Sequence, residues 1–138
     1  MNPISGAQQH CIQRAAGLIE AKFTSHLRRK EMARAAGMSV SYFSYLFSRQ
    51  FRLSPHQYLV RCRLQHARKL LLMREKDLSI ADVACECGFA DQAHFTRHFR
   101  RAYGVSPLAF VRAVRGISKS PNVQYSARQL FNPGSDIR

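Results

Sequence analysis

The chain contains one sequence unit twice, and this duplication restricts the possible folds more than any other feature. Positions of the first copy recur 51 residues later up to a pair of glycines, and 52 residues later beyond them. The matching positions are Ala33, Gly37, Phe43, Phe47, Phe51, Ser54, Pro55 and Tyr58 in the first copy and Ala84, Gly88, Phe95, Phe99, Tyr103, Ser106, Pro107 and Phe110 in the second. Each copy predicts a short helix, a tight turn at its glycine and a longer amphipathic helix, which is a helix-turn-helix arrangement.

Helical spacing of apolar residues predicts four helices in the first half of the chain. A first amphipathic helix begins near residue 10, a short helix covers 30–36, and a third covers about 40–51. The longest helix covers about 55–73, and the hydroxyl of Ser54 can cap its start. This helix has two adjacent apolar stripes, so we expect both halves of the chain to pack on it.

Capping residues mark the helices of the second copy. Ser79 and Asp82 have the spacing of a capping box, with aspartate in place of the usual glutamate. Asp91 is a suitable N-cap for the helix that carries the second copy's aromatic residues, and Ser106 for a last short helix. The sequence therefore predicts an all-α fold of about seven helices, with two helix-turn-helix subdomains joined by a long linker helix. The expected boundaries are 1–9 for a flexible N-terminus, 10–54 for the first subdomain, 55–73 for the linker helix, 74–115 for the second subdomain and 116–138 for a loosely ordered tail.

The charge of the chain favours a polyanionic partner. Lysine and arginine number 22 against 8 acidic residues, which gives a formal net charge of +14 and a sequence pI near 10.7. Nucleic acid is the first expectation for such a chain. No continuous apolar span or signal-peptide core accompanies the charge. We therefore expect a soluble cytoplasmic protein that does not bind membranes.

No arrangement of reactive residues predicts an enzyme. Paired carboxylates, a catalytic triad and a phosphate-binding glycine loop are all missing from the sequence. His94 and His98 are four residues apart but lack an evident third ligand, so no metal site and no cofactor are expected. The four cysteines are more simply interpreted as structural residues than as redox centres or alkyl acceptors: Cys11, Cys62, Cys85 and Cys87.

The face of each longer helix opposite its phenylalanines is the candidate base-reading surface, because each residue turns the helix by about 100°. In the first copy the base-reading candidates are Ser41, Ser44, Tyr45 and Arg49. In the second copy they are Gln92, Ala93, Thr96 and Arg97. Amide and guanidinium groups discriminate between bases by about 1–3 kcal/mol per bidentate contact, whereas hydroxyls are permissive. We therefore expect the second copy to set more of the sequence preference.

Other basic residues are candidates for contacts with phosphates. Lys30 and Arg52 flank the first reading helix, and Arg100 and Arg101 lie near the end of the second. Further basic residues, Arg63 among them, could also touch phosphates, although most are expected to be solvated. A solvated basic face is the simpler interpretation for a single helix, but the presence of two copies favours nucleic-acid binding.

The second copy resembles the DNA-binding domain of the AraC/XylS family of bacterial transcription regulators. The resemblance covers about residues 10–115 and is carried by Ala84, Gly88-Phe89, Phe95, Phe99-Arg100, Gly104, Ser106-Pro107 and Phe110. It implies two recognition helices that enter adjacent major grooves on one face of the duplex. The chain looks like the short stand-alone members, which implies an activator that binds as a monomer and contacts RNA polymerase.

The family's base-contacting positions fall on candidates already named, with some departures. By resemblance they are Ser41, Ser44, Tyr45, Gln92, Ala93, Thr96 and Arg97. Ser41 and Ser44 are smaller than the side chains that related activators often use, and Ala93 can make only apolar contact. The target sequence of a relative is therefore not transferable to this chain.

Two functional interpretations stay open besides a sequence-specific activator of transcription. In one, DNA binding is mainly charge-driven and activity depends on a protein partner, RNA polymerase or a co-regulator, bound through apolar tail residues such as Tyr125, Leu130 and Phe131. In the other, a cysteine has a chemical role. RNA is the less favoured nucleic acid, because the A-form major groove does not admit a helix.

Overall fold

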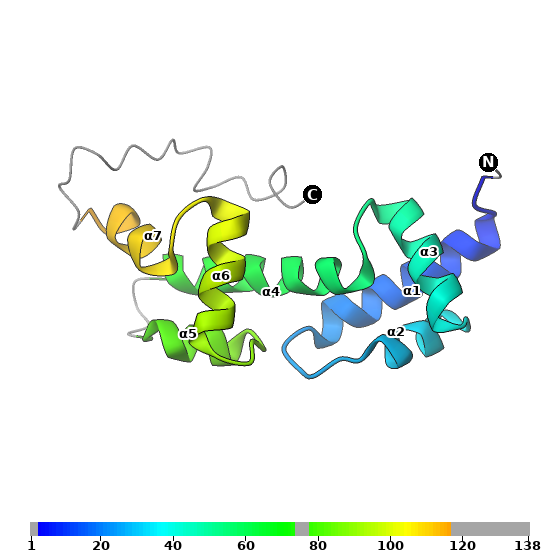
Figure 1. The fold of residues 1–138 in the computed structure, drawn as a ribbon, viewed down its shortest axis with the longest axis horizontal. Coiled ribbons are helices and arrows are strands. Elements are labelled where there is room, and N and C mark those ends of the chain that lie inside the picture. Colours follow the sequence, from blue (N-terminus) through cyan, green and yellow to red (C-terminus); the bar gives the residue numbers. More distant parts are fainter. Residues whose placement is uncertain (1–2, 74–77, 117–138) are drawn as a thin grey trace. The chain divides into compact units, whose positions relative to one another are not determined.

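The computed structural model describes residues 3–73 and 78–116, and all regular secondary structure in these residues is helical. Seven helices follow one another along the described chain (Figure 1): α1 Gly6–Lys22, α2 Arg29–Ala36, α3 Val40–Phe51, α4 Pro55–Leu72, α5 Ile80–Glu86, α6 Gln92–Tyr103 and α7 Pro107–Val114. The predicted all-α fold with two helix-turn-helix subdomains is confirmed. The predicted tail is Gly116 plus residues outside the described part of the chain.

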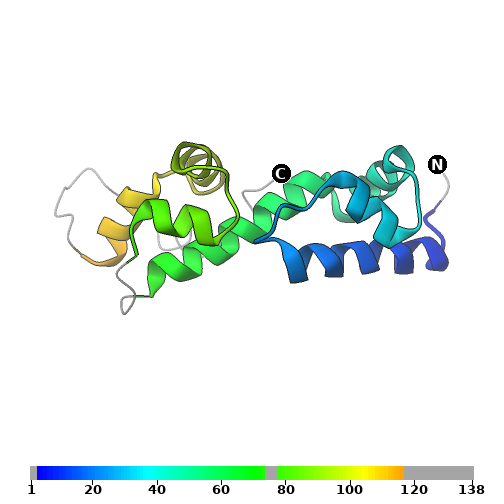
Figure 2. The same ribbon diagram turned by 90° about the horizontal axis from the view of Figure 1, so that it is seen from below.

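The chain divides into two compact units, Met1–Cys62 and Arg63–Arg138, and the division falls inside α4. In unit 1, helices α1, α2 and α3 contact one another (Figure 2). In unit 2, α6 contacts both α5 and α7. Each unit therefore contains one helix-turn-helix pair, α2–α3 in unit 1 and α5–α6 in unit 2.

Aromatic rings of α3 form the centre of the unit 1 core. Phe43 and Phe47 are fully buried, and their ring centroids lie 5.5 Å apart. Tyr58 of α4 meets Phe47 edge-on at 5.4 Å and donates a hydrogen bond of 2.5 Å from its hydroxyl to Glu20 of α1. These contacts attach the first part of α4 to the helices of unit 1.

The unit 2 core repeats this arrangement with the equivalent residues. Phe95, Phe99 and Phe110 are fully buried. The Phe99 ring lies 5.6 Å from Phe95, 4.6 Å from Tyr103 and 5.5 Å from Phe110, and so connects α6 to α7. Interlocked aromatic rings of this kind contribute both buried area and favourable ring-edge geometry.

The two tight turns adopt the same backbone conformation. Gly37 has a φ of 69° and Gly88 a φ of 89°, which is the left-handed region that favours glycine. In each turn the amide after the glycine donates to the carbonyl five residues earlier, at 3.0 Å: Met38 to Ala33, and Phe89 to Ala84. The predicted turn at each glycine is therefore confirmed, and each turn directs its longer helix away from the shorter one.

Side-chain caps fix where the helices begin. Ser79 and Asp82 form the predicted reciprocal capping box of α5, and the Asp91 carboxylate accepts the His94 amide at 2.7 Å. At the N-terminus, Ser5 and Gln8 form a further capping box, and α1 begins at Gly6. The predicted flexible segment 1–9 was therefore too long, because α1 already begins at Gly6. The first turn of α1 has few apolar residues, so helical spacing does not indicate this early start. No helix in residues 3–73 and 78–116 is long and apolar enough to cross a membrane.

Candidate nucleic-acid interface

The predicted reading face of α3 lies opposite the core of unit 1. Burial of Phe43, Leu46 and Phe47 turns the other side of the helix toward solvent. Ser41 and Tyr45 are exposed on that side, and Tyr45 keeps 54% of its surface accessible. Ser44 and Arg49 are half-buried. All four candidates of the first copy therefore retain surface with which to contact a partner.

Tyr45 and Arg49 are linked on this face. The guanidinium carbon of Arg49 lies 5.6 Å from the centre of the Tyr45 ring, and Arg49 Nη1 donates a long hydrogen bond of 3.4 Å to the Tyr45 hydroxyl. A cation above an aromatic ring is attracted by the ring's negative face. The pair presents a planar ring and a positive charge together, so a change in either residue affects the other.

Tyr42 is an exposed residue of α3 that is not among the predicted base-reading residues. It keeps 43% of its surface accessible, and its hydroxyl accepts a hydrogen bond of 2.5 Å from Gln8 Nε2 of α1. The side chain is thus held near the start of α3 by a residue 34 positions earlier in the chain. Only the packing of α1 against α3 reveals this contact.

The predicted reading face of α6 is equally open in unit 2. Gln92, Ala93 and Arg97 are exposed and Thr96 is half-buried, while Phe95 and Phe99 fill the core behind them. The predicted phosphate contacts are exposed as well: Lys30, Arg52, Arg100 and Arg101.

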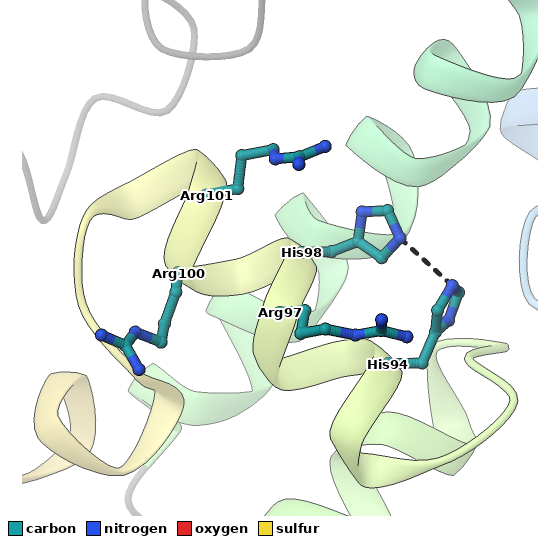
Figure 3. A pocket seen from close by; sticks show the side chains of 5 residues that line it. All are labelled: His94, Arg97, His98, Arg100 and Arg101. Carbon is teal, nitrogen blue, oxygen red and sulfur yellow. Dashed lines mark hydrogen bonds between the residues drawn. The ribbon is translucent and has the colours of Figure 1, made fainter.

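A shallow depression beside α6 collects nitrogen-bearing side chains (Figure 3). Its lining consists of His94, Arg97, His98, Arg100 and Arg101. Arg97, His98 and Arg101 extend from one side of α6, and Arg100 extends from the other. The Nε2 atoms of His94 and His98 lie 3.1 Å apart, and both rings pack near Phe89. The guanidinium groups of Arg97 and Arg101 on the side of the histidines give this side of α6 a positive field that attracts anions.

Arg63 does not belong to the exposed basic surface. It is the one charged residue among the buried positions of the described chain, with 7% of its surface accessible. Its guanidinium carbon lies 6.0 Å from the centre of the Phe89 ring, and burial lowers the pKa of this group. The expectation that Arg63 could contact a phosphate was wrong, because its side chain is buried next to Phe89. The basic sequence around it does not indicate this burial.

Arg52 combines a strained backbone with a predicted phosphate contact. Its φ of 61° lies in the left-handed region, and it occupies the position equivalent to Gly104, whose φ is 79°. We expect Arg52→Gly to stabilise unit 1 by up to about 1 kcal/mol, because the left-handed conformation costs a non-glycine residue about 1–2 kcal/mol and the freer unfolded chain offsets part of the gain. The same change should weaken binding to all duplexes alike. Urea unfolding and binding titrations measure the two effects, and Arg52→Ala, which keeps the strain, is the control; a destabilised Arg52→Gly variant would contradict the strain argument.

The thiols differ in their surroundings and should differ in reactivity. Burial raises the pKa of Cys87 to about 12 and that of Cys62 to about 11, whereas Cys85 is exposed. Since the thiolate is the reactive form, we expect iodoacetamide at pH 8 to label Cys85 first and Cys87 last. Mass spectrometry of peptides after timed labelling measures the order. Equal labelling of Cys85 and Cys87 would show that unit 2 opens faster than the reagent reacts.

The sequence and the fold of this chain are both similar to those of known proteins. A family model described as "Helix-turn-helix domain" matches residues 32–113, from inside α2 to inside α7. The crystal structure of the DNA-binding domain of AdpA, a global transcriptional factor, in complex with a target DNA superposes with a TM-score of 0.70. The two sequences are 28% identical, and the similarity covers 77% of this chain and 94% of that one.

Two curated relatives match the same region in sequence. The probable transcriptional regulator LumQ of Photobacterium leiognathi is 39% identical over 102 residues, which cover 71% of this chain. The virulence regulon transcriptional activator VirF of Yersinia enterocolitica is 32% identical over 95 residues, which cover 69% of this chain. The matched region spans 40% of the length of LumQ and 34% of that of VirF.

Proposed function

This chain belongs to the AraC-type family of helix-turn-helix transcription regulators, and from that premise we propose that it activates transcription as a monomer that reads duplex DNA with α3 and α6. Each recognition helix is proposed to enter one major groove, and the two half-sites to lie about one helical turn apart, near 10 bp. The single observation that carries this proposal is the presence of an exposed polar face on the longer helix of each copy.

The two reading faces differ in chemistry, which supports an asymmetric site. The face of α6 offers an amide at Gln92 and a guanidinium at Arg97, groups suited to adenine and guanine edges. The face of α3 offers hydroxyls and the linked pair of Tyr45 and Arg49. We propose that Ser41, Ser44, Ala93 and Thr96 complete these faces by hydroxyl and apolar contacts. An asymmetric site would be read by one monomer without a second copy.

Lys30 is proposed to bind a phosphate from the first turn of α2, together with Arg52, Arg100 and Arg101 at other positions. We expect Lys30→Ala to weaken binding to every duplex by a similar factor, and to reduce the slope of log affinity against log salt by about one. Fluorescence anisotropy with a preferred and an unrelated duplex across a salt series measures both quantities. Loss confined to the preferred duplex would assign Lys30 to base reading instead.

Activation through RNA polymerase is a further part of the proposal. VirF is named as a transcriptional activator, and its match with this chain supports the same direction of regulation here. Transcription in vitro from a template that carries the selected site tests this directly. Increased transcript with added protein would support activation, whereas a decrease would make the chain a repressor.

The alternative is that a protein partner carries the specificity and that DNA is held mainly by charge. Its motivation is the formal net charge of +14 together with the apolar residues of the tail. A variant without residues 117–138 distinguishes the two proposals. Unchanged selectivity and unchanged activation in that variant would remove the tail from the mechanism.

Competition binding tests the proposed partner class. We expect the chain to prefer a mixed-sequence DNA duplex over double-stranded RNA of equal length and charge at near-physiological salt, since a helix does not fit the A-form major groove. Equal affinity for the two duplexes would mean that electrostatic attraction to phosphates, and not the shape of the groove, determines binding. Single-stranded DNA with the same number of phosphates is the control for electrostatic attraction alone.

A further inference from the structure

His94 and His98 form a pair that DNA reading does not require. They lie about one helical turn apart on α6, and both are half-buried at the depression beside the helix (Figure 3). Their ring centroids lie 4.5 Å apart with the rings nearly perpendicular. Two histidines four residues apart on one helix face are a recurring arrangement for sharing one metal ion.

We propose that His94 and His98 bind one divalent transition-metal ion through their two Nε2 atoms. The 3.1 Å between these atoms is the observation that carries the proposal. Imidazole nitrogens bind such ions at about 2.0–2.1 Å, so they lie about 2.9 Å apart at a right angle and about 3.3 Å apart at a tetrahedral angle. The observed separation falls between these limits, so the metal replaces the shared hydrogen bond without a change in the spacing of the two nitrogens.

The His94 ring can turn toward a shared metal ion. Each lone pair has to point to the shared metal instead of to the other ring, and the terminal torsion of histidine is broad. No described residue forms a hydrogen bond to His94 Nδ1, so turning this ring breaks no bond at that atom. Phe89 lies 5.8 Å from the His94 ring and 6.1 Å from the His98 ring and limits the motion of both.

The surroundings determine which ion and which further ligands fit. Among the described residues, no third His, Cys, Asp or Glu joins the pair to form a larger cluster. Water or an anion therefore fills the remaining positions. The guanidinium groups of Arg97 and Arg101 repel a bare cation, and an anion among the ligands offsets this repulsion. Nitrogen and oxygen ligands in an open site suit Ni²⁺ and Cu²⁺. Because Cu²⁺ also oxidises thiols, Ni²⁺ is the suitable probe.

Thiols that compete for the metal have to be removed before the measurement. Cys85 is exposed and Cys11 is half-buried, and both are changed to serine in all variants. Burial raises the pKa of Cys62 and Cys87, so these remain protonated and bind metal poorly. In this background the histidines are the principal ligands for Ni²⁺.

Calorimetric titration of Ni²⁺ into this background tests the proposal, which does not depend on DNA binding. We expect one ion per chain, and an affinity at least about tenfold lower in both His94→Gln and His98→Gln, since losing even an outer-sphere partner costs that much. His26→Gln, an exposed histidine of unit 1, is the matched control and should bind as before. Equal affinity in His98→Gln and His26→Gln would overturn the proposal.

A second measurement needs no substitution at the site. Ni²⁺ broadens nuclear magnetic resonance signals close to it, so the ring protons of His94 and His98 should disappear at the lowest ion concentrations. Signals of His10 and His26, both exposed in unit 1, should persist. Earlier loss of the His10 or His26 signals would place the metal elsewhere and overturn the proposal, whether or not the variants fold.

Discussion

Replacing Phe99 by alanine is expected to lower the free energy of unfolding of unit 2 by about 3–5 kcal/mol. Phe99 is fully buried and contacts Phe95, Tyr103 and Phe110 at once, so its removal leaves a cavity at the junction of α6 and α7. Domains of this size are stable by only about 5–15 kcal/mol, so the loss is a large fraction of the total. Urea unfolding followed by far-ultraviolet circular dichroism measures it.

Leu108→Ala is the matched control for this prediction. Leu108 is also an apolar residue of unit 2, but 48% of its surface is accessible. Its truncation removes little buried area and should change the stability by about 0.5 kcal/mol or less. A loss below about 1 kcal/mol in Phe99→Ala would show that the aromatic cluster repacks and does not hold the two helices together.

Arg97→Ala is expected to relax base preference in one half-site without a general loss of affinity. Arg97 is exposed on α6, where it lines the depression, and it has no buried role that its loss would disturb. A bidentate guanidinium contact to guanine is worth about 1–3 kcal/mol of discrimination, which is roughly a five- to 150-fold change in relative affinity. Titration of the preferred duplex and of single-base variants of each half-site measures this discrimination.

Arg112→Ala controls for the loss of one positive charge. Arg112 is exposed on α7, a helix that belongs to neither helix-turn-helix pair. Its removal should weaken binding slightly and equally for all duplexes. If Arg97→Ala caused the same uniform loss, Arg97 would be a phosphate contact and the reading surface of α6 would have to be redrawn.

Most of the fold could be predicted because its signals are local and occur twice. Gly37 and Gly88 mark equivalent turns, and Ser79 and Asp91 cap helices through side chains that reach only three residues ahead. Periodic phenylalanines then define the buried face of each long helix, and the opposite face follows from helical geometry. The exposure of Tyr45 and Arg97 could be predicted in the same way.

Features that depend on contacts between separate segments could not be predicted. Arg63 lies on an apparently basic helix, and only the nearby Phe89 ring reveals that its side chain is buried. The bond between Gln8 and Tyr42 joins residues of different helices. The left-handed backbone of Arg52 has no local signal either, because an arginine stands where the second copy has Gly104. For Arg63 and Tyr42, contacts between separate segments decide what the neighbouring sequence does not indicate.

Selection of bound duplexes from a random DNA pool at near-physiological salt tests most directly whether one chain contains two unequal readers of DNA. Sequencing of the enriched pool should give a motif with two different half-sites about 10 bp apart. The half-site read by α6 should show the stronger base preference. Enrichment of one half-site alone would mean that one copy only positions the chain on the backbone. Tight binding without any enriched sequence would contradict base reading by both helices and leave charge as the source of affinity.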